Sequence, residues 1–294
     1  MFIELLNPKN DYVFKRIFGY VGNENITKQM LNAIIKTPIE NIKLNQSTIL
    51  EKDLLNDKVG IVDIYAKLNN KIDVDIEMQV VNQKNIEKRL LFYWSKLYAK
   101  VIKEGKNYGK LHNTIAILIA DFEMNKLKSI KKFCTKWQIR EEEYTSVILT
   151  DDLELYILEL PKGKKNGIKI EEQLKPCLNF LENPKDMEIV DMSSKNTIAV
   201  KEAKKVLEQI SQDEREQYLA HLREKYILDQ KAVEAFGYDN GLEDGIKQGI
   251  AQGLQDGLKQ RTIEIVKQML KQNYTIEAIT SITGLTKEEI EKLK

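Results

Sequence analysis

The sequence contains very few of the residues that most often carry metal or nucleophilic chemistry. Two cysteines and two histidines occur among 294 residues. Cys134 and Cys177 are far apart and form no CxxC pair, which disfavours a disulfide framework and a zinc site. His112 and His221 are also widely separated, and no Ser/His/Asp or Cys/His arrangement is recognisable. Histidine-based and thiol-based catalysis are therefore disfavoured, and we expect both histidines to serve the surface or helix packing.

Long apolar runs are missing as well. No segment approaches the roughly 18 consecutive apolar residues of a membrane helix. The first residues, MFIELLNPKND, have no basic region, and their apolar run stops at Leu6, unlike a secretion signal. The sequence therefore predicts a protein of the reducing cytoplasm without a membrane anchor.

The chain has almost no net charge, but its charges are unevenly distributed. Hydrophobic residues make up 42% and charged residues 31%, which is the balance of a globular protein, and the formal charge is +1. Residues 84–140 nevertheless hold 14 Lys or Arg against four acids. Such a segment either faces phosphate groups or forms an ordinary solvated surface.

Hydrophobic periodicity predicts an α/β first part and an all-helical remainder. Apolar spacing indicates helices over 9–36, interrupted at Gly22, and over 85–105. The run TIAILIADF at 114–122 is typical of a strand that is buried on both faces. We predict further strands over 44–55, 59–68, 72–81, 147–149 and 155–160, and helices over 171–182, 197–211 and 212–236.

A glycine repeat follows these helices. In NGLEDGIKQGIAQGLQDGLKQ glycine recurs every fourth residue from Gly241 to Gly257, and a Leu or Ile follows each glycine. Each glycine inside a helix costs roughly 0.5–1 kcal/mol relative to alanine, so a helix here needs compensation. Close approach of two helices along the glycine stripe would supply it. We predict that residues 241–260 form an interface between two copies of the chain, giving a dimer; a flexible linker is the alternative.

Two short helices are predicted after the repeat. One begins near Thr275 and the other at Thr286, where TKEE supplies a capping box with Glu289; Gly284 marks the turn between them. The pair resembles a minimal helix-turn-helix, but we favour plain packing.

The stretch VGIVDIYAKLNNKIDVDIEMQVV, residues 59–81, predicts a hairpin whose register is fixed by its pattern. A turn at Asn69-Asn70-Lys71 makes Leu68 face Ile72 and gives one wholly apolar face. A slip by one residue would mix the two faces. On the opposite face the predicted pairs are Lys67 with Asp73, Tyr65 with Asp75, and Asp63 with Glu77.

The pairing of Asp63 with Glu77 would hold two carboxylates close together. Directly opposed residues have Cβ atoms roughly 4.5–5.5 Å apart, and carboxylates at that distance repel unless a cation lies between them. Either the polar face is hydrated, with Lys67 relieving Asp73, or it binds a hard cation. Mg²⁺ prefers carboxylate oxygens and leaves room for a phosphate. Gln79, two positions after Glu77, points the same way and would border the water bound to such a metal.

Five motifs in a fixed order carry a resemblance to a known family. They are NPKNDYVFKRIFG, GIVDIYAK, DIEMQ, RLLFYWSKLYAKVIKEGKNYGKL and IAILIADF, within about residues 7–125. An acid on one strand and an acid-x-Lys or variant on the next, between two helices, resembles the core of the PD-(D/E)XK nuclease superfamily. The ordered set more specifically resembles the Rpn family of recombination-promoting nucleases, also described as PD-(D/E)XK family transposases. The resemblance implies an α/β, restriction-endonuclease-like core with a mixed sheet flanked by helices, followed by an all-helical C-terminal region.

The same resemblance implies a function and a set of site residues. The function is that of a Mg²⁺-dependent DNA endonuclease, with Mn²⁺ as an alternative ion, in recombination, transposition or defence against foreign DNA. Asp63, Glu77 and the backbone carbonyl of Met78 would bind the metal, and Gln79 would be the third catalytic side chain. The superfamily usually has lysine at this position; glutamine can only orient the attacking water, so the metal must activate it. The alternative is a catalytically weak or inactive DNA-binding protein that keeps the nuclease fold.

Further residues are candidates for phosphate contacts. Spacings of 4, 3 and 4 residues place four polar side chains on one face of the 85–105 helix: Arg89, Tyr93, Lys96 and Lys100. We predict that Arg89, Tyr93 and Lys96 contact phosphate, the alternative being a solvated helix face. Lys15 in the first helix joins this set. Asp11, one turn before it, either adds a carboxylate to the site or pairs with Lys15.

The predicted organisation has four parts, and the expected partners are DNA and a second copy of the chain. The parts are a nuclease core over 1–165, a helical region over 166–236, the glycine helix over 237–262 and a terminal helical pair over 263–294.

Overall fold

A computed structural model describes residues 4–35, 37–45, 64–82, 85–100, 102, 107–185 and 195–293. The chain forms two compact units, Met1–Asp229 and Gln230–Lys294. No helix in the described ranges combines the length and the apolar character needed to span a bilayer.

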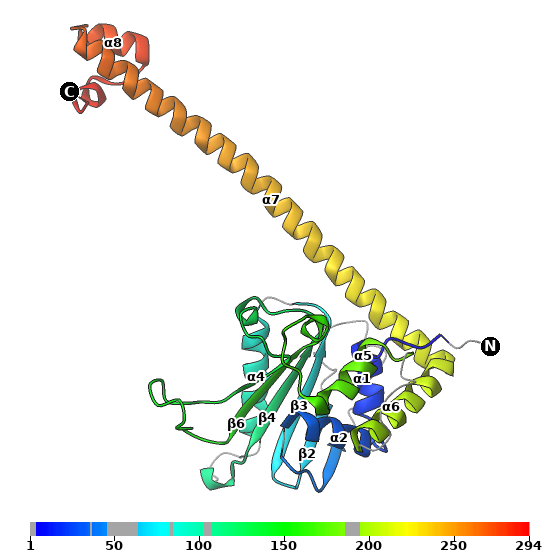
Figure 1. The fold of residues 1–294 in the computed structure, drawn as a ribbon. Helices are drawn as coiled ribbons and strands as arrows, with labels where there is room; N and C mark the ends of the chain where they lie inside the picture. Colours follow the sequence, from blue (N-terminus) through cyan, green and yellow to red (C-terminus); the bar gives the residue numbers. More distant parts are fainter. Residues whose placement is uncertain are drawn as a thin grey trace. The chain divides into compact units, whose positions relative to one another are not determined.

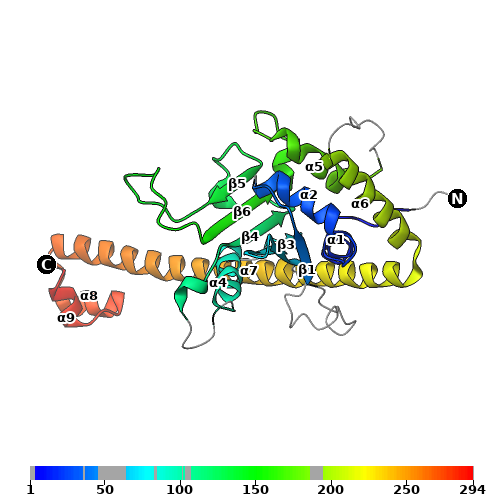
Figure 2. The ribbon, with the colours of Figure 1, turned by 90° about the horizontal axis from the view of Figure 1, so that it is seen from below.

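The first unit is built on a mixed sheet, which has six strands in the part of the chain that the structure describes (Figure 2). The strands follow the spatial order β1-β2-β3-β4-β6-β5. β3, β4 and β6 are parallel, and the remaining neighbours pair antiparallel. The strands are β1 (Ile42–Asn45), β2 (Ile64–Leu68), β3 (Ile72–Gln79), β4 (Thr114–Ala120), β5 (Cys134–Trp137) and β6 (Leu153–Glu159).

Helices cover both faces of this sheet (Figure 1). α4 (Ile86–Lys100) packs on one face against β4 and forms the smaller of two apolar cores. The other face carries the main core and the helices α1 (Asp11–Phe18), α2 (Glu24–Ile35), α5 (Lys175–Glu182) and α6 (Lys195–Gln212). Short 3₁₀ helices span Tyr108–Lys110, Asn125–Leu127, Leu160–Lys164 and Glu172–Leu174. This arrangement confirms the predicted α/β fold class with flanking helices.

Local sequence sets both ends of α1. The side-chain oxygen of Asn10 accepts hydrogen bonds from the backbone N–H groups of Tyr12 at 3.0 Å and Val13 at 3.4 Å, which caps the helix. Gly19 ends the helix against β2, where an added Cβ would lie 2.9 Å from Cγ1 of Ile64. Glycine is therefore required where α1 approaches the start of β2.

The hairpin of β2 and β3 has the predicted register. Its backbone pairs are Ile64–Ile76, Tyr65–Asp75, Ala66–Val74, Lys67–Asp73 and Leu68–Ile72. Asn69 and Asn70 make the turn with φ angles of 48° and 59°, in the left-handed region that asparagine tolerates. The predicted pair Asp63–Glu77 stays a prediction, because Asp63 belongs to residues 46–63, which lie outside the described residues.

One predicted strand is wrong, and one observed strand was not predicted. Residues 147–149 form no strand; they make one isolated bridge, Arg140–Ile148, and Leu149 is 77% exposed. β5 is absent from the prediction, because this short segment pairs only with β6 at the sheet edge and needs no continuous apolar run. β1 covers only the start of the strand predicted over 44–55, and residues 46–55 lie outside the described ranges.

The helices that follow the sheet pack onto it. α6 packs against α1 and α2, and its Ala203 and Leu207 join the main core. α7 (Glu214–Lys271) begins in the same unit. The compact unit thus extends past residue 165 to Asp229, because the apolar faces of α1 and α2 are covered by α6.

The second unit contains the rest of α7, α8 (Ile276–Thr283) and α9 (Lys287–Glu291). Thr275 caps α8, and the predicted capping box of Thr286 with Glu289 begins α9. Gly284 turns the chain between them with a φ angle of 71°. A small core of Val266, Ile279 and Ile290 holds these helices together, which agrees with plain packing.

α7 continues through the glycine repeat without a break. Apart from the helix's own backbone, a Cβ added at any glycine from Gly237 to Gly257 would meet no atom of the described residues within 4 Å. The apolar side chains beside these glycines are 52–68% exposed: Leu242, Ile246, Ile250, Leu254 and Leu258. The repeat is therefore helical rather than a flexible linker, and its apolar side chains are exposed in the single chain.

Candidate active site

Three acids alternate along β3 and lie on the side of α4. Asp73, Asp75 and Glu77 are 1%, 8% and 1% exposed. The residues between them belong to the main core on the opposite face of the sheet. On β4, the neighbours of Asp75 and Glu77 are Ala116 and Leu118, which pack under α4. The acids of β3 on the polar face are therefore buried, which contradicts the hydrated alternative for these three residues, whereas Tyr65 and Lys67 of β2 on the same face are half-buried.

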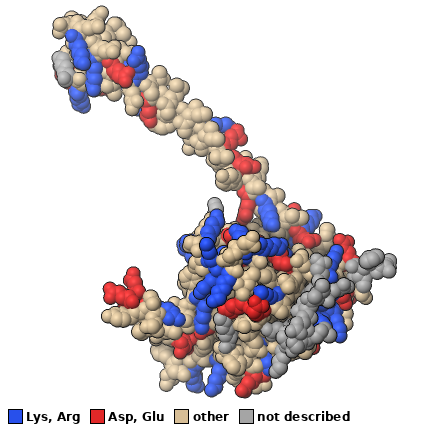
Figure 3. Space-filling model, viewed as in Figure 1, with Lys and Arg blue, Asp and Glu red and all other residues tan. Residues whose placement is uncertain are grey.

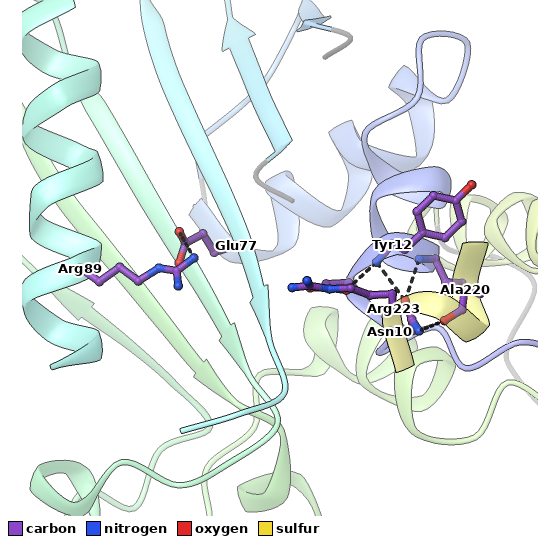
Figure 4. Close-up of polar contacts among 8 residues, drawn as sticks. Asn10, Tyr12, Glu77, Arg89, Ala220 and Arg223 are labelled. Carbon is purple, nitrogen blue, oxygen red and sulfur yellow. Dashed lines mark hydrogen bonds and ion pairs between the residues drawn. The ribbon is translucent and has the colours of Figure 1, made fainter. Parts of the chain in front are cut away.

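Glu77 is a buried carboxylate that forms an ion pair but accepts no hydrogen bond from the described residues. Nη2 of Arg89, on α4, lies 3.5 Å from Oε1 of Glu77 (Figure 4). Neither carboxylate oxygen accepts a hydrogen bond from any residue that the structure describes. Burying a charge costs several kcal/mol unless it is paired and hydrogen-bonded. Both oxygens of Glu77 thus retain lone pairs for a cation or a water molecule.

Asp75 lies two residues before Glu77 on the same face of β3. Burial, and secondarily the charge of Glu77, raises the pKa of Asp75 to about 7, while the positive charges of Arg89 and Lys15 act in the opposite direction. A cation between the two acids would relieve both burial and repulsion. The sequence suggested no role for Asp75, although strand alternation already places it beside Glu77.

Asp73 is fully engaged, in contrast to Glu77. It accepts a hydrogen bond from the Tyr65 hydroxyl at 2.6 Å, and Nε2 of His112 lies 2.7 Å from its other oxygen. Nζ of Lys67 lies 3.8 Å away, which confirms the predicted Lys67–Asp73 pair. His112 therefore contacts the acidic strand, whereas we expected it to serve only the surface or helix packing. The contact arises because β4 begins at Thr114, which pairs with Asp73, and His112 lies two residues before Thr114.

The predicted phosphate-contacting residues of α4 lie at different depths. The Arg89 guanidinium lies 5.4 Å from the centre of the Tyr93 ring, and both side chains are partly buried. Lys96 is exposed, with Nζ 5.7 Å from the centre of the Phe92 ring. Arg89 and Tyr93 thus adjoin the acids, whereas Lys96 lies on the outer surface of the helix.

The two candidates in α1 have separate environments. Lys15 is 6% exposed, and its charge opposes the raised pKa of Asp75, so α1 adds positive charge to the acidic site. Asp11 is bound by Arg223 of α7, with Nε 2.8 Å and Nη2 2.6 Å from Oδ2. Neither alternative for Asp11 included this partner. No local pattern could reveal Arg223, because it lies 212 residues away in the chain.

The opening motif around Asp11 mainly anchors α7 (Figure 4). The Asn10 side-chain amide donates to the carbonyl of Ala220 at 3.0 Å. Glu216 accepts a hydrogen bond from the Tyr12 hydroxyl and pairs with Arg16, both at 2.8 Å. Burial and Glu216 raise the pKa of Tyr12. The motif therefore fixes the first turns of α7 on α1, inside the first unit.

The catalytic and metal-binding roles of Asp63, Glu77, Gln79 and the Met78 carbonyl all stay predictions. Asp63 lies outside the described residues. Met78 has its side chain in the main core, and its backbone carbonyl is the predicted ligand. Gln79 ends β3 partly exposed, and its carbonyl accepts a hydrogen bond from Asp121 N–H at 2.9 Å. Its side chain follows Glu77 on the same face by strand alternation.

The donor atoms at the site fit a hard divalent cation. Within the described ranges, no three His, Cys, Asp or Glu side chains form a complete metal-binding group. Asp75 and Glu77 nevertheless supply adjacent carboxylates, and Glu77 has both oxygens free of hydrogen bonds from the described residues. Mg²⁺ commonly takes one or two carboxylates and completes its shell with waters and substrate phosphates. Oxygen ligands alone also favour such an ion over zinc or copper.

The basic residues of 84–140 lie on both faces of the sheet. One group gathers over α4 (Figure 3). Another, Lys132 and Lys136, lines a cavity of about 410 Å³ together with Lys169 and the end of α2. Among the described residues of the segment, the basic side chains therefore form no single phosphate-facing surface, and the α4 group is the one beside the acids.

A mixed sheet with buried carboxylates on its hairpin, below a basic helix, defines a nuclease-type α/β core. A family model described as PD-(D/E)XK nuclease family transposase matches residues 8–235, and the chain belongs to this family. The match confirms the resemblance and extends beyond residues 7–125, through the helices up to the glycine repeat. Neither the curated proteins nor the solved structures gave a match.

Proposed function

We propose that the protein is a Mg²⁺-dependent DNA endonuclease, acting in recombination, transposition or defence against foreign DNA. One observation carries the proposal: Glu77 is buried beside Asp75 with no hydrogen bond to its carboxylate from the described residues. This costly arrangement lies on β3 of a chain that belongs to a PD-(D/E)XK nuclease family. A divalent cation would offset the cost and would bring a phosphate to the same place.

The side chains around Glu77 have distinct roles in this proposal. Asp63, Glu77 and the Met78 carbonyl would hold the ion, which would supply Lewis acidity and an acidified water. Arg89, released from Glu77, donates to a phosphate oxygen. Gln79 orients the attacking water through its amide. The water oxygen forms a bond to phosphorus and releases a proton to the solvent, and the bond from phosphorus to one sugar oxygen breaks, with that oxygen taking up a proton from solvent water.

Nicking of supercoiled plasmid tests this proposal. The wild-type chain should convert supercoiled plasmid to open circles with Mg²⁺ or Mn²⁺, and EDTA should stop the reaction. Asp63→Ala should lose the activity, because the ion loses a carboxylate. Equal rates for the wild type and Asp63→Ala, or no nicking by the wild type with either ion, would reject the mechanism and favour a DNA-binding protein with the nuclease fold.

We also propose that residues 241–260 join two copies of the chain. Two observations support this proposal: no side chain of the described residues lies near the helical glycine stripe, and five Leu and Ile residues beside it are exposed. A contiguous exposed apolar stripe of this kind marks an interaction surface. Backbone approach along the glycines would offset their cost to the helix.

Light scattering coupled to size-exclusion chromatography measures this association. The full chain should elute with twice its mass of 34.1 kDa, and a chain ending at residue 236 should be monomeric. Gly249→Leu should weaken the dimer, because it places a large side chain in the stripe. Gln248→Ala is the matched control on the adjacent helix position and should leave the mass unchanged. A monomeric full chain would refute the interface.

A further inference from the structure

The outer surface of α4 presents an aromatic ring between lysines. Phe92 is 58% exposed, although burial of such a ring would favour folding. Lys88 and Lys96 lie one turn before and one turn after it, and both are exposed. Nζ of Lys96 lies 5.7 Å from the centre of the Phe92 ring. The ring is therefore open to a ligand, and its surroundings are positively charged.

The charge of this surface favours a polyanion over a protein partner. Glu87 is the one acid within α4, whose residues are all described, and it forms an ion pair with Lys126 at 3.2 Å. Lys88, Lys96 and Lys100 therefore have no acid neighbour on their own helix. A second apolar side chain, Leu91, is 48% exposed beside Phe92.

A continuous row of side chains connects Phe92 with the acidic site. The Phe92 and Tyr93 rings meet edge to face with centres 5.6 Å apart. The Arg89 guanidinium lies 5.4 Å from the Tyr93 ring and 3.5 Å from Glu77. Cations and rings thus follow one another from the buried carboxylate to the outer surface of one helix.

We propose that Phe92 stacks on an unpaired base of single-stranded DNA while Lys88 and Lys96 contact the flanking phosphates. The inference rests on DNA being the substrate, as in the proposed function, and it defines the substrate class: DNA with unpaired bases next to the bond that is cut. In a duplex both faces of each base are covered by neighbouring bases, so the ring can stack only on a base that is free. Alternating lysines and aromatic rings are the usual elements of such a surface.

Fluorescence anisotropy with two labelled oligonucleotides tests the stacking. The first probe is a 12-mer of thymidines, and the second has the same backbone and charge with abasic sites at its central positions. The full chain is titrated in EDTA, where no cleavage occurs. The wild type should bind the thymidine probe about tenfold more tightly than the abasic probe, and Phe92→Ala should remove this difference. Phe92→Trp should restore it.

Two matched variants separate stacking from other effects. Leu91→Ala removes a neighbouring exposed apolar side chain and should bind both probes like the wild type. Lys96→Ala should weaken binding to both probes equally and reduce the salt dependence by about one counterion. Wild-type affinity of Phe92→Ala for the thymidine probe, an equal loss on both probes, or an altered oligomeric mass of Phe92→Ala would overturn the stacking proposal.

The binding test is independent of catalysis. A ring-dependent preference for bases in a chain that nicks no plasmid would support the stacking and refute the nuclease. Metal-dependent nicking by a chain in which Phe92→Ala changes no affinity would support the nuclease and refute the stacking.

Discussion

Glu77→Gln is expected to lower the rate of plasmid nicking by about 1,000-fold while the protein stays folded. The amide keeps the size of the side chain but removes the negative charge that a divalent cation requires. Without the ion the chain loses its Lewis acid and its source of an acidified water. The buried position of Glu77, 1% exposed, leaves no room for a neighbouring acid to move into its place.

The same variant should also lose its thermal response to the ion. Binding of a ligand to the folded state raises the melting temperature. The wild type should therefore melt at a higher temperature in Mg²⁺ than in EDTA, and Glu77→Gln should melt at the same temperature in both. Glu154→Gln is the matched control: Glu154 is a buried acid of the same sheet that is bound by Lys136 and Tyr156. It should keep both the activity and the response to Mg²⁺. Normal nicking by Glu77→Gln would refute the assignment of this residue.

Asp75→Asn is expected to stabilise the metal-free protein at pH 8 by on the order of 4 kcal/mol. Burial and the charge of Glu77 raise the pKa of Asp75 to about 7, from an ordinary value of 3.8. Below about pH 4 the carboxyl is protonated in both the folded and the unfolded chain, and the substitution should change little. As the pH rises to 7 the unfolded chain releases this proton and the folded chain retains it, so the wild type loses stability. Asparagine carries no such cost, and its advantage should level off above pH 7.

Urea unfolding in EDTA between pH 4 and pH 8 measures this difference. Asp73→Asn on the same strand should lower the stability of the protein where Asp75→Asn raises it, because Asp73 is bound by Tyr65, His112 and Lys67. It should destabilise the protein by about 1–2 kcal/mol at pH 8. A stability advantage of Asp75→Asn that did not vary with pH, or a loss of stability, would contradict the assigned cause.

Much of the candidate site followed from local patterns. Alternation and the asparagine turn predicted the pairing of Lys67 with Asp73 and placed Asp75 and Glu77 on one face, and the backbone register confirms this arrangement. A strand has a side-chain period of two, so one residue of slip would place apolar groups on the polar face. The ordered motifs likewise identified the family, and the family match confirms it.

Burial was the property that local patterns predicted least well. The hairpin left open whether its acids face water, and α4 decides the question by covering them. The contacts of His112 and Arg223 could not be predicted from local patterns either. Each binds its aspartate across a large separation in the chain, 39 residues for His112 and Asp73 and 212 for Arg223 and Asp11. Such pairs have no periodicity within one element that could reveal them.

By itself, the sequence determined the hairpin register, the capping box of Thr286 with Glu289 and the family, because period, turn chemistry and motif order are all properties of neighbouring residues. Only the tertiary structure decided that the acids of β3 are buried and that the pKa of Asp75 is raised. Helix α4 excludes water from Asp75 and Glu77, and Arg89 and Lys15 supply charge from two different helices. The energy of a carboxylate depends on everything that surrounds it in space, and those surroundings come from segments that only folding brings together.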